Sequence, residues 1–336
     1  MPTWVRGRDS PRRRRLVEDP CRNPVTATKR NLDAHAVRDR LVHNLTHVVK
    51  LPDGVIEPLL CGLVTGGHLL VEGIPGIGKT LLARTLAASI AGSFRRVQFT
   101  NDLMPADVIG ASVWRQDTSQ FAFVPGPLFA NLVLADEINR TSPRTLSCLL
   151  EAMENGRVSV DGQTYELARP FTVLATRNPI EFHGTFPVPE AALDRFLIRV
   201  ELDYPAPDLE LALYTGDDAE ARLAAIEPVM HPDDLLDLQQ RVRTVEVKQP
   251  VAEYALHLVQ ATREHPEVQL GASPRAALAW LQAARARALL DGRDYVLPDD
   301  LKALAGFTLA HRVFLHHGGS AEQLVRELTL ATPVPL

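Results

Sequence analysis

The sequence predicts an α/β fold, in which a core with a five-stranded, mostly parallel sheet precedes a helical C-terminal domain. Five short runs of β-prone apolar residues are each followed by turn residues, at positions 69–71, 96–99, 132–135, 171–175 and 196–202. The third and fourth runs are almost continuously apolar, as expected for strands buried on both faces of a parallel sheet. After Pro205 and Pro207 the strand signal largely ends, and Ala, Leu and Arg recur at helical spacing.

Helical stretches separate most of these runs, for example at residues 79–91 and 143–154. Strands alternating with helices at this spacing predict a parallel sheet. Two predicted hairpins interrupt the alternation, and one of them turns at Asp161 and Gly162, a strong hairpin signal. The paired runs are 157–160 with 164–167, and 111–114 with 121–124.

A length of 336 residues suits about two domains. Because the pattern changes near residues 203–208, we expect an α/β core over residues 31–204 and a helical domain over residues 205–336. Residues 1–30 contain nine Lys or Arg, three Asp or Glu and several prolines, so we expect a basic, disordered, solvated tail. Its four consecutive arginines, residues 12–15, could instead bind an anionic surface or a polyanion. The tail could also lie upstream of the true start.

Composition argues against several classes of protein. Hydrophobic residues make up 46% and charged residues 23%, which excludes extensive disorder. No charge-free apolar run reaches about 18 residues, so we expect no membrane span, and residues 1–30 lack the apolar segment of a secretory signal. Cys21, Cys61 and Cys148 are too far apart for a metal knuckle, which favours a reduced, cytoplasmic setting. The net charge of −5 leaves −11 outside the tail, which argues weakly against bulk nucleic-acid binding.

A glycine-rich loop follows the first predicted strand. The pattern G-x-x-x-x-G-K-[ST] is matched by Gly73-Ile74-Pro75-Gly76-Ile77-Gly78-Lys79-Thr80, which opens an amphipathic helix, as this motif requires. Glycines let successive backbone N–H groups turn around phosphate oxygens, and a helix N-terminus adds partial positive charge. Lys79 would reach the β- and γ-phosphates, and the Thr80 hydroxyl would bind Mg²⁺. A purely structural glycine turn is the alternative.

An acidic pair ends the third predicted strand. Asp136 could hold the Mg²⁺ shell, while Glu137 could polarise a water molecule for in-line attack on a γ-phosphate. Strand ends often carry acidic residues, so the pair gains its meaning from the loop upstream. Asn178, just past the fourth predicted strand, could orient the attacking water or bind the γ-phosphate. A turn asparagine before Pro179 explains Asn178 equally well.

Together these motifs resemble the AAA+ ATPases and, within them, the MoxR family. The matching blocks follow the family order over roughly residues 40–315, so that only the N-terminal tail clearly lies outside the resemblance. The blocks are 66–73 (GGHLLVEG), 97–100 (VQFT), 125–130 (PGPLFA), 135–140 (ADEINR), 149–153 (LLEAM), 175–180 (ATRNPI), 189–196 (PEAALDRF) and 271–276 (GASPRA).

The resemblance implies an ATP- and Mg²⁺-dependent hydrolase that forms a ring, hexameric in the family, with nucleotide at the subunit interfaces. Asn178 would be the first sensor, and Arg275 would be a second sensor that reaches the γ-phosphate from the helical lid domain. Arg195 would be the finger offered to the neighbouring subunit's ATP. A surface ion pair is the alternative for either arginine. Nucleotide contacts would come from Gly73, Pro75, Gly76, Ile77, Gly78, Lys79, Thr80, Leu81 and Asp136.

Family members act as chaperone-like assembly factors, for metal insertion or complex maturation, commonly with a partner that has a von Willebrand A domain. The resemblance therefore implies remodelling of a protein client, and it implies that the predicted hairpins face the pore or the partner. Two alternatives are a motor that translocates on nucleic acid and a scaffold that binds ATP with negligible turnover. The acidic body argues against the motor, and the complete set of motif residues argues against the scaffold.

Some features depart from the family or lie outside its motifs. The family usually has a Gly-Gln pair near the base, where this sequence has Lys50-Leu51-Pro52-Asp53, so the adenine contacts are left open. In the helical domain, Asp299 is expected to cap the helix that begins after Pro298. His311, His316 and His317 are expected at the end of a helix or on the surface rather than at a metal.

Overall fold

The computed structural model describes residues 32–52, 54–74, 76–178, 186–204, 207–214 and 218–334. The predicted tail, residues 1–30, and the predicted nucleotide contact Pro75 lie outside these ranges. Residues 32–336 form one compact unit by their backbone contacts. Among the described residues, no helix combines the length and the apolar character that a membrane span would need.

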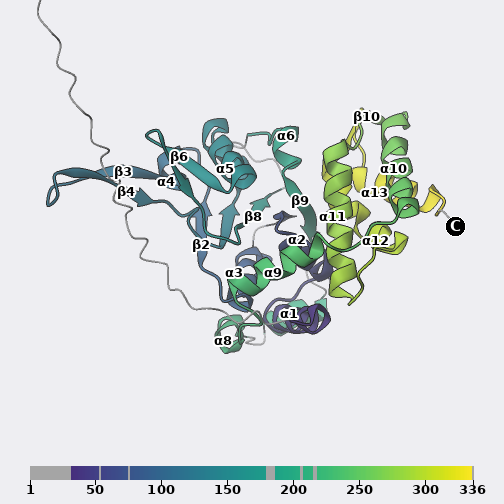
Figure 1. Cartoon of the computed structure of the whole chain (residues 1–336), viewed down its shortest axis with the longest axis horizontal. Coiled ribbons are helices and arrows are strands. Elements are labelled where there is room, and N and C mark those ends of the chain that lie inside the picture. The colour runs from purple at the N-terminus through teal and green to yellow at the C-terminus, as the bar shows by residue number, and fades with distance from the viewer. Residues whose placement is uncertain are drawn as a thin grey trace, which may run out of the picture. The chain divides into compact units, whose positions relative to one another are not determined.

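The centre of the core is a five-stranded sheet in which all neighbouring strands are parallel (Figure 1). The strand order β2-β5-β8-β1-β9 places the strand before the glycine-rich loop next to the strand before Asn178. These five strands confirm the predicted α/β fold with a parallel sheet. Their bounds are β1 (His68–Gly73), β2 (Phe94–Gln98), β5 (Leu132–Asp136), β8 (Thr172–Arg177) and β9 (Phe196–Leu202).

Strand β8 extends two residues beyond its predicted apolar run. Thr176 and Arg177 continue the pairing with Val71 and Glu72 of β1. The Glu72 carboxylate is buried and pairs with Arg177 at 2.6 Å and with Arg199 of β9 at 2.8 Å. The buried carboxylate is therefore compensated by two guanidinium groups, and a pattern of apolar residues alone does not reveal the end of the strand.

Alternate residues of the buried strands pack into two separate cores. On β1, Leu69 and Val71 join the core that includes α1, α2 and α3, whereas Leu70 joins the core on the opposite face. Strand β5 divides in the same way, because successive side chains of a strand point to opposite faces. Both faces of the sheet are therefore covered, as a parallel sheet requires.

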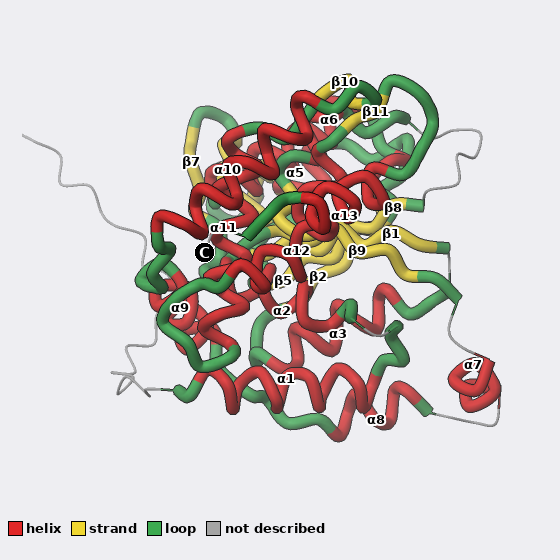
Figure 2. The backbone as a smooth tube through the Cα atoms, turned by 90° about the vertical axis from the view of Figure 1, so that its right-hand side faces the viewer, coloured by secondary structure: helices red, strands yellow, loops and turns green. Residues whose placement is uncertain are grey.

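Helices and two hairpins complete this part of the chain. Figure 2 shows α1 and α3 on one side of the strands, and Figure 1 shows the β3–β4 hairpin extending away from the sheet. The helices are α1 (Ala34–Val48), α2 (Ile56–Thr65), α3 (Lys79–Ser89), α4 (Pro105–Ile109), η1 (Ile138–Arg140), α5 (Pro143–Asn155) and α6 (Glu190–Leu193). The hairpins are β3 (Gly110–Arg115) with β4 (Gln120–Pro125), and β6 (Arg157–Val160) with β7 (Gln163–Glu166), as predicted.

The chain after β9 is mainly helical, with one small two-stranded sheet of β10 and β11. Helix α11 packs against α2 of the core, so that the helical part continues the hydrophobic core on that side. The elements are α7 (Pro207–Tyr214), α8 (Ala219–Ala225), α9 (Pro232–Val242), α10 (Gln249–Glu264), β10 (Val268–Leu270), α11 (Pro274–Leu290), α12 (Pro298–Leu309), η2 (Ala310–Arg312), β11 (Phe314–Leu315) and α13 (Ala321–Ala331).

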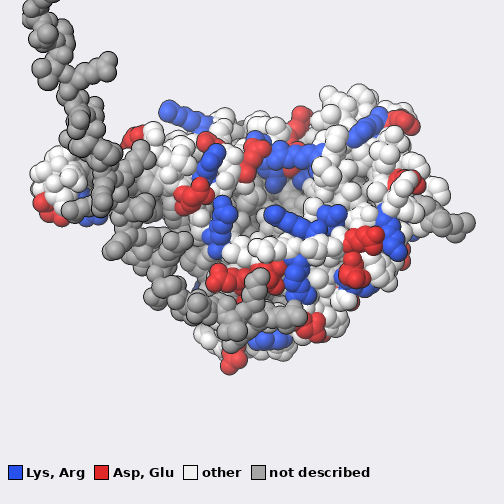
Figure 3. Space-filling view, in the orientation of Figure 1, with Lys and Arg blue, Asp and Glu red and all other residues white. Residues whose placement is uncertain are grey.

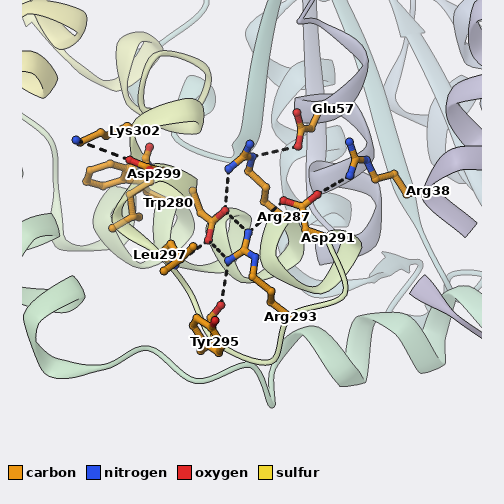
Figure 4. A network of polar contacts seen from close by, with 12 residues as sticks. Arg38, Glu57, Trp280, Arg287, Asp291, Arg293, Tyr295, Leu297, Asp299 and Lys302 are labelled. Carbon is orange, nitrogen blue, oxygen red and sulfur yellow. Dashed lines mark hydrogen bonds and ion pairs between the residues drawn. The ribbon is translucent and has the colours of Figure 1, made fainter. Parts of the chain in front are cut away.

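A network of ion pairs joins α11 and α12 to α1 and α2 (Figure 4). At its centre, the buried Asp300 accepts hydrogen bonds from Arg287 at 2.8 Å and from both terminal nitrogens of Arg293 at 2.7 Å. Arg287 also pairs with Glu57 of α2 at 3.1 Å. Asp291 pairs with Arg38 of α1 at 2.5 Å and with Arg293 at 3.1 Å. Charged groups far apart in sequence therefore hold these four helices together.

One sequence prediction about this helical part is corrected, and the expected position of His311 at the end of a helix is made more precise. The N-cap of α12 is Leu297, and its N–H donates to Asp300 at 2.8 Å, so Asp300 serves the helix start that was assigned to Asp299. The Asp299 side chain is 83% exposed. His311 does follow a helix, but its ring is buried and hydrogen-bonds the carbonyl oxygen of Phe196 at 2.8 Å.

Replacing Asp300 should destabilise the fold far more than replacing its neighbour. Asp300→Ala leaves two guanidinium groups without their buried partner, and we expect the free energy of unfolding to fall by about 3–5 kcal/mol. The control Asp299→Ala removes an exposed carboxylate and should cost less than about 1 kcal/mol. Urea denaturation of both variants measures the difference. Equal losses would show that Asp300 is not the central charge of this network.

His68 is a buried histidine held in its neutral form. Its Nδ1 accepts from the Val173 N–H at 3.0 Å, while Nε2 lies 3.0 Å from the Met153 carbonyl oxygen, to which it donates. A second ring proton would face the N–H of Val173. Burial therefore lowers the pKa of His68 to about 4, against the smaller opposing effect of the bond to Met153.

The fold should lose stability in mild acid because of this histidine. The unfolded chain takes up the proton near pH 6.5 and the folded chain only near pH 4, so stability present above pH 6.5 is lost as the pH falls toward 4. Between pH 7 and pH 5 we expect the wild type to lose about 2 kcal/mol more than His68→Gln, which cannot titrate there. Denaturation curves at both pH values measure this difference. Parallel losses in the two proteins would contradict the assignment.

Candidate functional site

The glycine-rich loop connects β1 to α3, and two of its glycines are required by the backbone. Gly73 has φ 150°, and a Cβ at this position would lie 2.4 Å from the Leu202 carbonyl oxygen of β9. Gly78 is the N-cap of α3 in a left-handed conformation, with φ 91°. The loop can therefore pass close to β9 and still present the first N–H groups of α3 toward a ligand.

Lys79, the first residue of α3, points back into the loop. Its Nζ donates to the carbonyl oxygens of Gly73 at 2.6 Å and Ile74 at 3.2 Å. These two bonds fix the ammonium at the loop and leave its third N–H for an anionic ligand. Partial burial lowers the pKa of Lys79, while Asp136 and Glu137 act in the opposite direction. Lys79, Asp136 and Glu137 line the same cleft.

Asp136 ends β5 between two polar neighbours on the adjacent strands. Arg96 of β2 donates to Oδ2 from Nη2 at 2.6 Å and from Nε at 3.2 Å. On the other side, the Thr176 hydroxyl of β8 donates to Oδ1 at 2.5 Å. The parallel register brings the carboxyl ends of β2, β5 and β8 together, since Gln98 lies beside Asp136 and Ala135 beside Ala175. Arg96, Asp136 and Thr176 therefore lie near the same end of the sheet. The carboxylate is therefore fixed on both sides.

Glu137 leaves the strand in a left-handed conformation, with φ 57°. Its backbone N–H donates to the Thr176 hydroxyl at 2.9 Å. Its carboxylate accepts from Gln98 at 3.0 Å and from Arg140 at 2.9 Å. A non-glycine residue with positive φ is uncommon, and such conformations cluster at functional sites. Here the turn directs Glu137 away from the path of the strand and toward Gln98.

One cleft of about 440 Å³ brings most of the predicted site residues together. Gly76, Gly78, Lys79, Thr80 and Leu81 from the loop and α3 share its wall with Asp136, Glu137 and Asn178. The backbone carbonyl of Asn178 accepts from the Asn139 side chain at 3.4 Å. The rest of the wall is formed by Arg84, Arg96, Gln98, Ala219 and Glu220.

A second, more apolar cleft of about 410 Å³ adjoins the first, since Gly76, Gly78 and Leu81 line both. Lys50, Leu51 and Pro52 form part of its wall. Its other lining residues are Val48, Val49, Ile74, Ile77, Leu202, Asp203, Tyr204, Glu210, Tyr214, Ala219 and Arg222. A polar cleft beside an apolar one suits a ligand with a charged end and an aromatic end.

The oxygen groups near the loop fit a magnesium ion. Thr80 supplies a hydroxyl and Asp136 a carboxylate to the same cleft, and Mg²⁺ prefers hard oxygen ligands together with substrate phosphates. Arg96 already binds Oδ2 of Asp136, so this arginine and the ion would share one carboxylate. Thr80 and Asp136 are therefore the residues of this cleft that would hold the ion.

Arg195 and Arg275 line neither cleft. Both instead pair with Glu154 near the end of α5, Arg195 at 3.1 Å and Arg275 at 3.4 Å. Arg195 also donates to the Ala191 carbonyl at 2.6 Å. The two predicted arginines therefore lie together, at a place separate from the glycine-rich loop of their own chain.

Three residues of the cleft region were not singled out by sequence reasoning. Arg96 and Gln98 of β2 bind Asp136 and Glu137, and Thr176 of β8 binds both acids. The sequence did contain a signal, because Arg96 and Gln98 are two residues apart and therefore point to the same face of β2. Polar side chains on one face of a strand indicate that this face adjoins a polar site. The strand order was needed to show which strands are neighbours.

Comparison with known proteins identifies related chains. The family described as "ATPase family associated with various cellular activities (AAA)" matches residues 68–198, and the AAA lid domain matches residues 260–328. A crystal structure of a candidate ATPase from Cytophaga hutchinsonii superposes with a TM-score of 0.80 at 35% identity. The match covers 90% of this chain and 96% of that one. The core, the lid and the ATPase assignment thus agree with the sequence prediction.

Curated relatives match over most of their length. An uncharacterized protein of Bacillus subtilis, YeaC, is 46% identical, over 90% of this chain and 97% of the relative. Chaperone MoxR1 of Mycobacterium tuberculosis is 37% identical, over 87% of this chain and 79% of the relative. Protein MoxR of Methylorubrum extorquens is 30% identical, over 82% of this chain and 87% of the relative. On these matches, the chain belongs to the MoxR family of AAA+ ATPases.

Proposed function

We propose that this ATPase hydrolyses Mg²⁺-ATP in the cleft beside the glycine-rich loop and uses the cycle to remodel a protein client. The observation that carries the proposal is the shared wall of one cleft, where Lys79 and Thr80 face Asp136, Glu137 and Asn178. These are a phosphate-binding cation, an ion-binding hydroxyl and carboxylate, a base and a neutral amide. Phosphoryl transfer to water uses this combination of groups.

Each residue of the cleft has a distinct proposed role. Lys79 and the N–H groups at the start of α3 neutralise and orient the phosphates. Thr80 and Asp136 hold Mg²⁺, which supplies charge neutralisation at the phosphate oxygens when bound. Glu137 accepts a proton from the attacking water, and Asn178 orients that water or hydrogen-bonds the γ-phosphate. Gln98 and Arg140 hold the Glu137 carboxylate by hydrogen bonds.

The apolar cleft is the proposed site for the adenine base. Apolar groups of Val49, Leu51 and Pro52 and the rings of Tyr204 and Tyr214 line it, and flat aromatic ligands bind between such groups. Gly73, Gly76, Ile77, Gly78 and Leu81 would then guide the phosphates from this cleft to Lys79. In this proposal the Lys50-Leu51-Pro52 segment offers apolar contact where the family has Gly-Gln.

We propose that Arg195 and Arg275 act on the ATP of the neighbouring subunit in a ring, hexameric as in the family. Both line neither cleft of their own chain, and both pair with Glu154, so one surface offers two guanidinium groups. An arginine supplied across an interface stabilises the charge of the transition state. Arg275 is proposed here as a sensor of the neighbour's nucleotide, together with the finger Arg195.

We propose that the client is a protein and that the ATPase acts on it together with a partner that has a von Willebrand A domain. A relative named as a chaperone, MoxR1 of Mycobacterium tuberculosis, supports a protein client. The β3–β4 hairpin supports a docking role, because Trp114 and Phe121 are 50% and 71% exposed and contact each other edge to face. On the face shown in Figure 3, basic and acidic side chains are mixed, which does not favour a nucleic-acid track.

Two broader assignments remain part of the proposal. The domain boundary is placed between residues 204 and 205, with the nucleotide-binding core over 31–204 and the lid over 205–336. We propose that the protein acts in the cytoplasm, because its cysteines are expected to be reduced. Cys61 and Cys148 are both free thiols, and burial raises the pKa of each.

Changes at Lys79 and Glu137 should separate ATP binding from hydrolysis. Lys79→Ala removes the ammonium that faces the phosphates, so binding of Mg²⁺-ATP by calorimetry should be lost. Glu137→Gln should bind ATP like the wild type but lower kcat by about 10²-fold or more, because the base is gone. Lys302→Ala, which changes a lysine on α12 paired with Asp299, is the control and should alter neither. Full turnover by Glu137→Gln would remove the residue from its role.

Subunit mixing should reveal whether Arg195 acts across an interface. Arg195→Ala alone lacks the finger at every site, and Glu137→Gln alone lacks the base at every site, so each protein should be nearly inactive. In mixed rings, some interfaces combine an intact Glu137 with an intact Arg195, so ATP turnover should return. Phosphate release is measured against the mixing ratio. Inactive mixtures would contradict action in trans, provided that mass measurements show mixed rings.

A further inference from the structure

A residue of the lid hydrogen-bonds the backbone on both sides of Arg195. Arg312, the last residue of η2, donates from Nη2 to the carbonyl oxygen of Asp194 at 2.9 Å and to that of Phe196 at 2.8 Å. Its Nε forms an ion pair with Oδ1 of Asp194 at 3.1 Å. Arg195 is the single residue between these two anchored carbonyls. A side chain of the lid thus bonds the carbonyl groups of the residues immediately before and after the proposed finger.

A second residue of the lid strengthens the same contact. His311 hydrogen-bonds the Phe196 carbonyl oxygen at 2.8 Å, so this oxygen accepts from two consecutive lid residues. Both Arg312 and His311 are buried. Three hydrogen bonds therefore reach residues 194 and 196 from η2, although these segments lie more than 110 residues apart. These contacts of η2 fix the backbone of residues 194–196, which we call the finger segment, relative to the lid.

The buried charge of Arg312 favours a positioning role over a purely stabilising one. Burial lowers the pKa of Arg312 to about 10, with Asp194 opposing the shift, so the guanidinium is charged at neutral pH. Enclosing such a charge is costly, and well-packed apolar residues often stabilise a fold as well or better. The planar guanidinium, however, donates to both carbonyl groups from Nη2 while its Nε faces Asp194 and its Nη1 donates to the Thr308 carbonyl. Neither an apolar side chain nor the single ammonium of a lysine can reproduce this fixed set of contacts.

Asp194 extends the contact to the second proposed interface arginine. Its Oδ2 lies 3.9 Å from Nε of Arg275, while Oδ1 faces Arg312. Arg275 and Arg195 in turn share Glu154. The lid residue Arg312 thereby contacts Asp194, and Asp194 lies next to Arg195 in sequence and to Arg275 in space.

We infer that Arg312 is a positioning residue, which sets the direction in which Arg195 leaves the core toward the neighbouring subunit. The inference rests on the proposed action of Arg195 in trans. It adds that the lid of one subunit controls hydrolysis in the next one, through the backbone at residues 194–196. Arg312 itself touches no nucleotide in this arrangement.

The test uses the full chain with two substitutions at this position. Arg312→Lys keeps the charge without the fork, and Arg312→Met keeps much of the volume without the charge. We expect both to bind Mg²⁺-ATP within about twofold of the wild type and to lower kcat by about 10- to 100-fold, as misplaced catalytic groups do. Arg326→Lys is the matched control, because Arg326 lies on α13 of the lid with its side chain 75% exposed, and it should leave kcat unchanged.

Two further readouts separate positioning from a general structural effect. Mixing Arg312→Met with Glu137→Gln subunits should restore turnover, since the second protein supplies an intact finger segment to sites that have an intact Glu137. The double variant Arg195→Ala with Arg312→Met should be no slower than Arg195→Ala alone, because both changes remove the same action. Circular dichroism and thermal unfolding establish that the variants are folded.

The outcomes distinguish this inference from the proposed function. If Arg195→Ala keeps full activity, the finger assignment fails, and the positioning inference fails with it. If Arg195→Ala is inactive but both Arg312 variants are fully active, only the positioning inference is overturned. Additive losses in the double variant, failed rescue by mixing, or failure of both Arg312 variants to fold would each also overturn it.

Discussion

The parallel pairing of β5 with β2 on one side and β8 on the other is the constraint on which the proposed nucleotide site depends. It brings three strand ends to one edge, where the single hydroxyl of Thr176 donates to Asp136 and accepts from the backbone of Glu137. Arg96 fixes the other oxygen of Asp136. The geometry of both acids is thus set by neighbouring strands before any ligand binds, which is the kind of preorganisation that lowers the cost of charge development.

Much of this core could be predicted from the sequence, because its signals are local. Apolar runs gave the five strands, the Asp161–Gly162 turn gave a hairpin, and the spacing of glycines before Lys79 gave the loop. Asp136 and Glu137 were predictable for the same reason, since they directly follow an apolar run. Asn178 was a candidate for the same reason, family resemblance favoured its sensor role over a turn asparagine, and the residue lines the same cleft.

What could not be predicted depends on contacts between distant segments. The choice between Asp299 and Asp300 depends on Arg287 of α11 and on Arg293, which follows that helix, whereas either aspartate is acceptable near a helix start. The buried position of His311 depends on a carbonyl group in β9. The common partner of Arg195 and Arg275 is 41 residues from one and 121 from the other, and no spacing rule connects such positions. Local patterns describe elements, whereas these features arise only when elements pack.

The sharing of Glu154 by two arginines has a consequence for how this surface can change over evolutionary time. One carboxylate partly compensates two positive charges, so loss of the acid would leave two cations side by side and repelling each other. Loss of either arginine, in contrast, leaves the acid with a remaining counterion. Charge compensation alone therefore constrains the acidic position more than either basic one, and the arginines are constrained in addition by their proposed action on a neighbouring nucleotide.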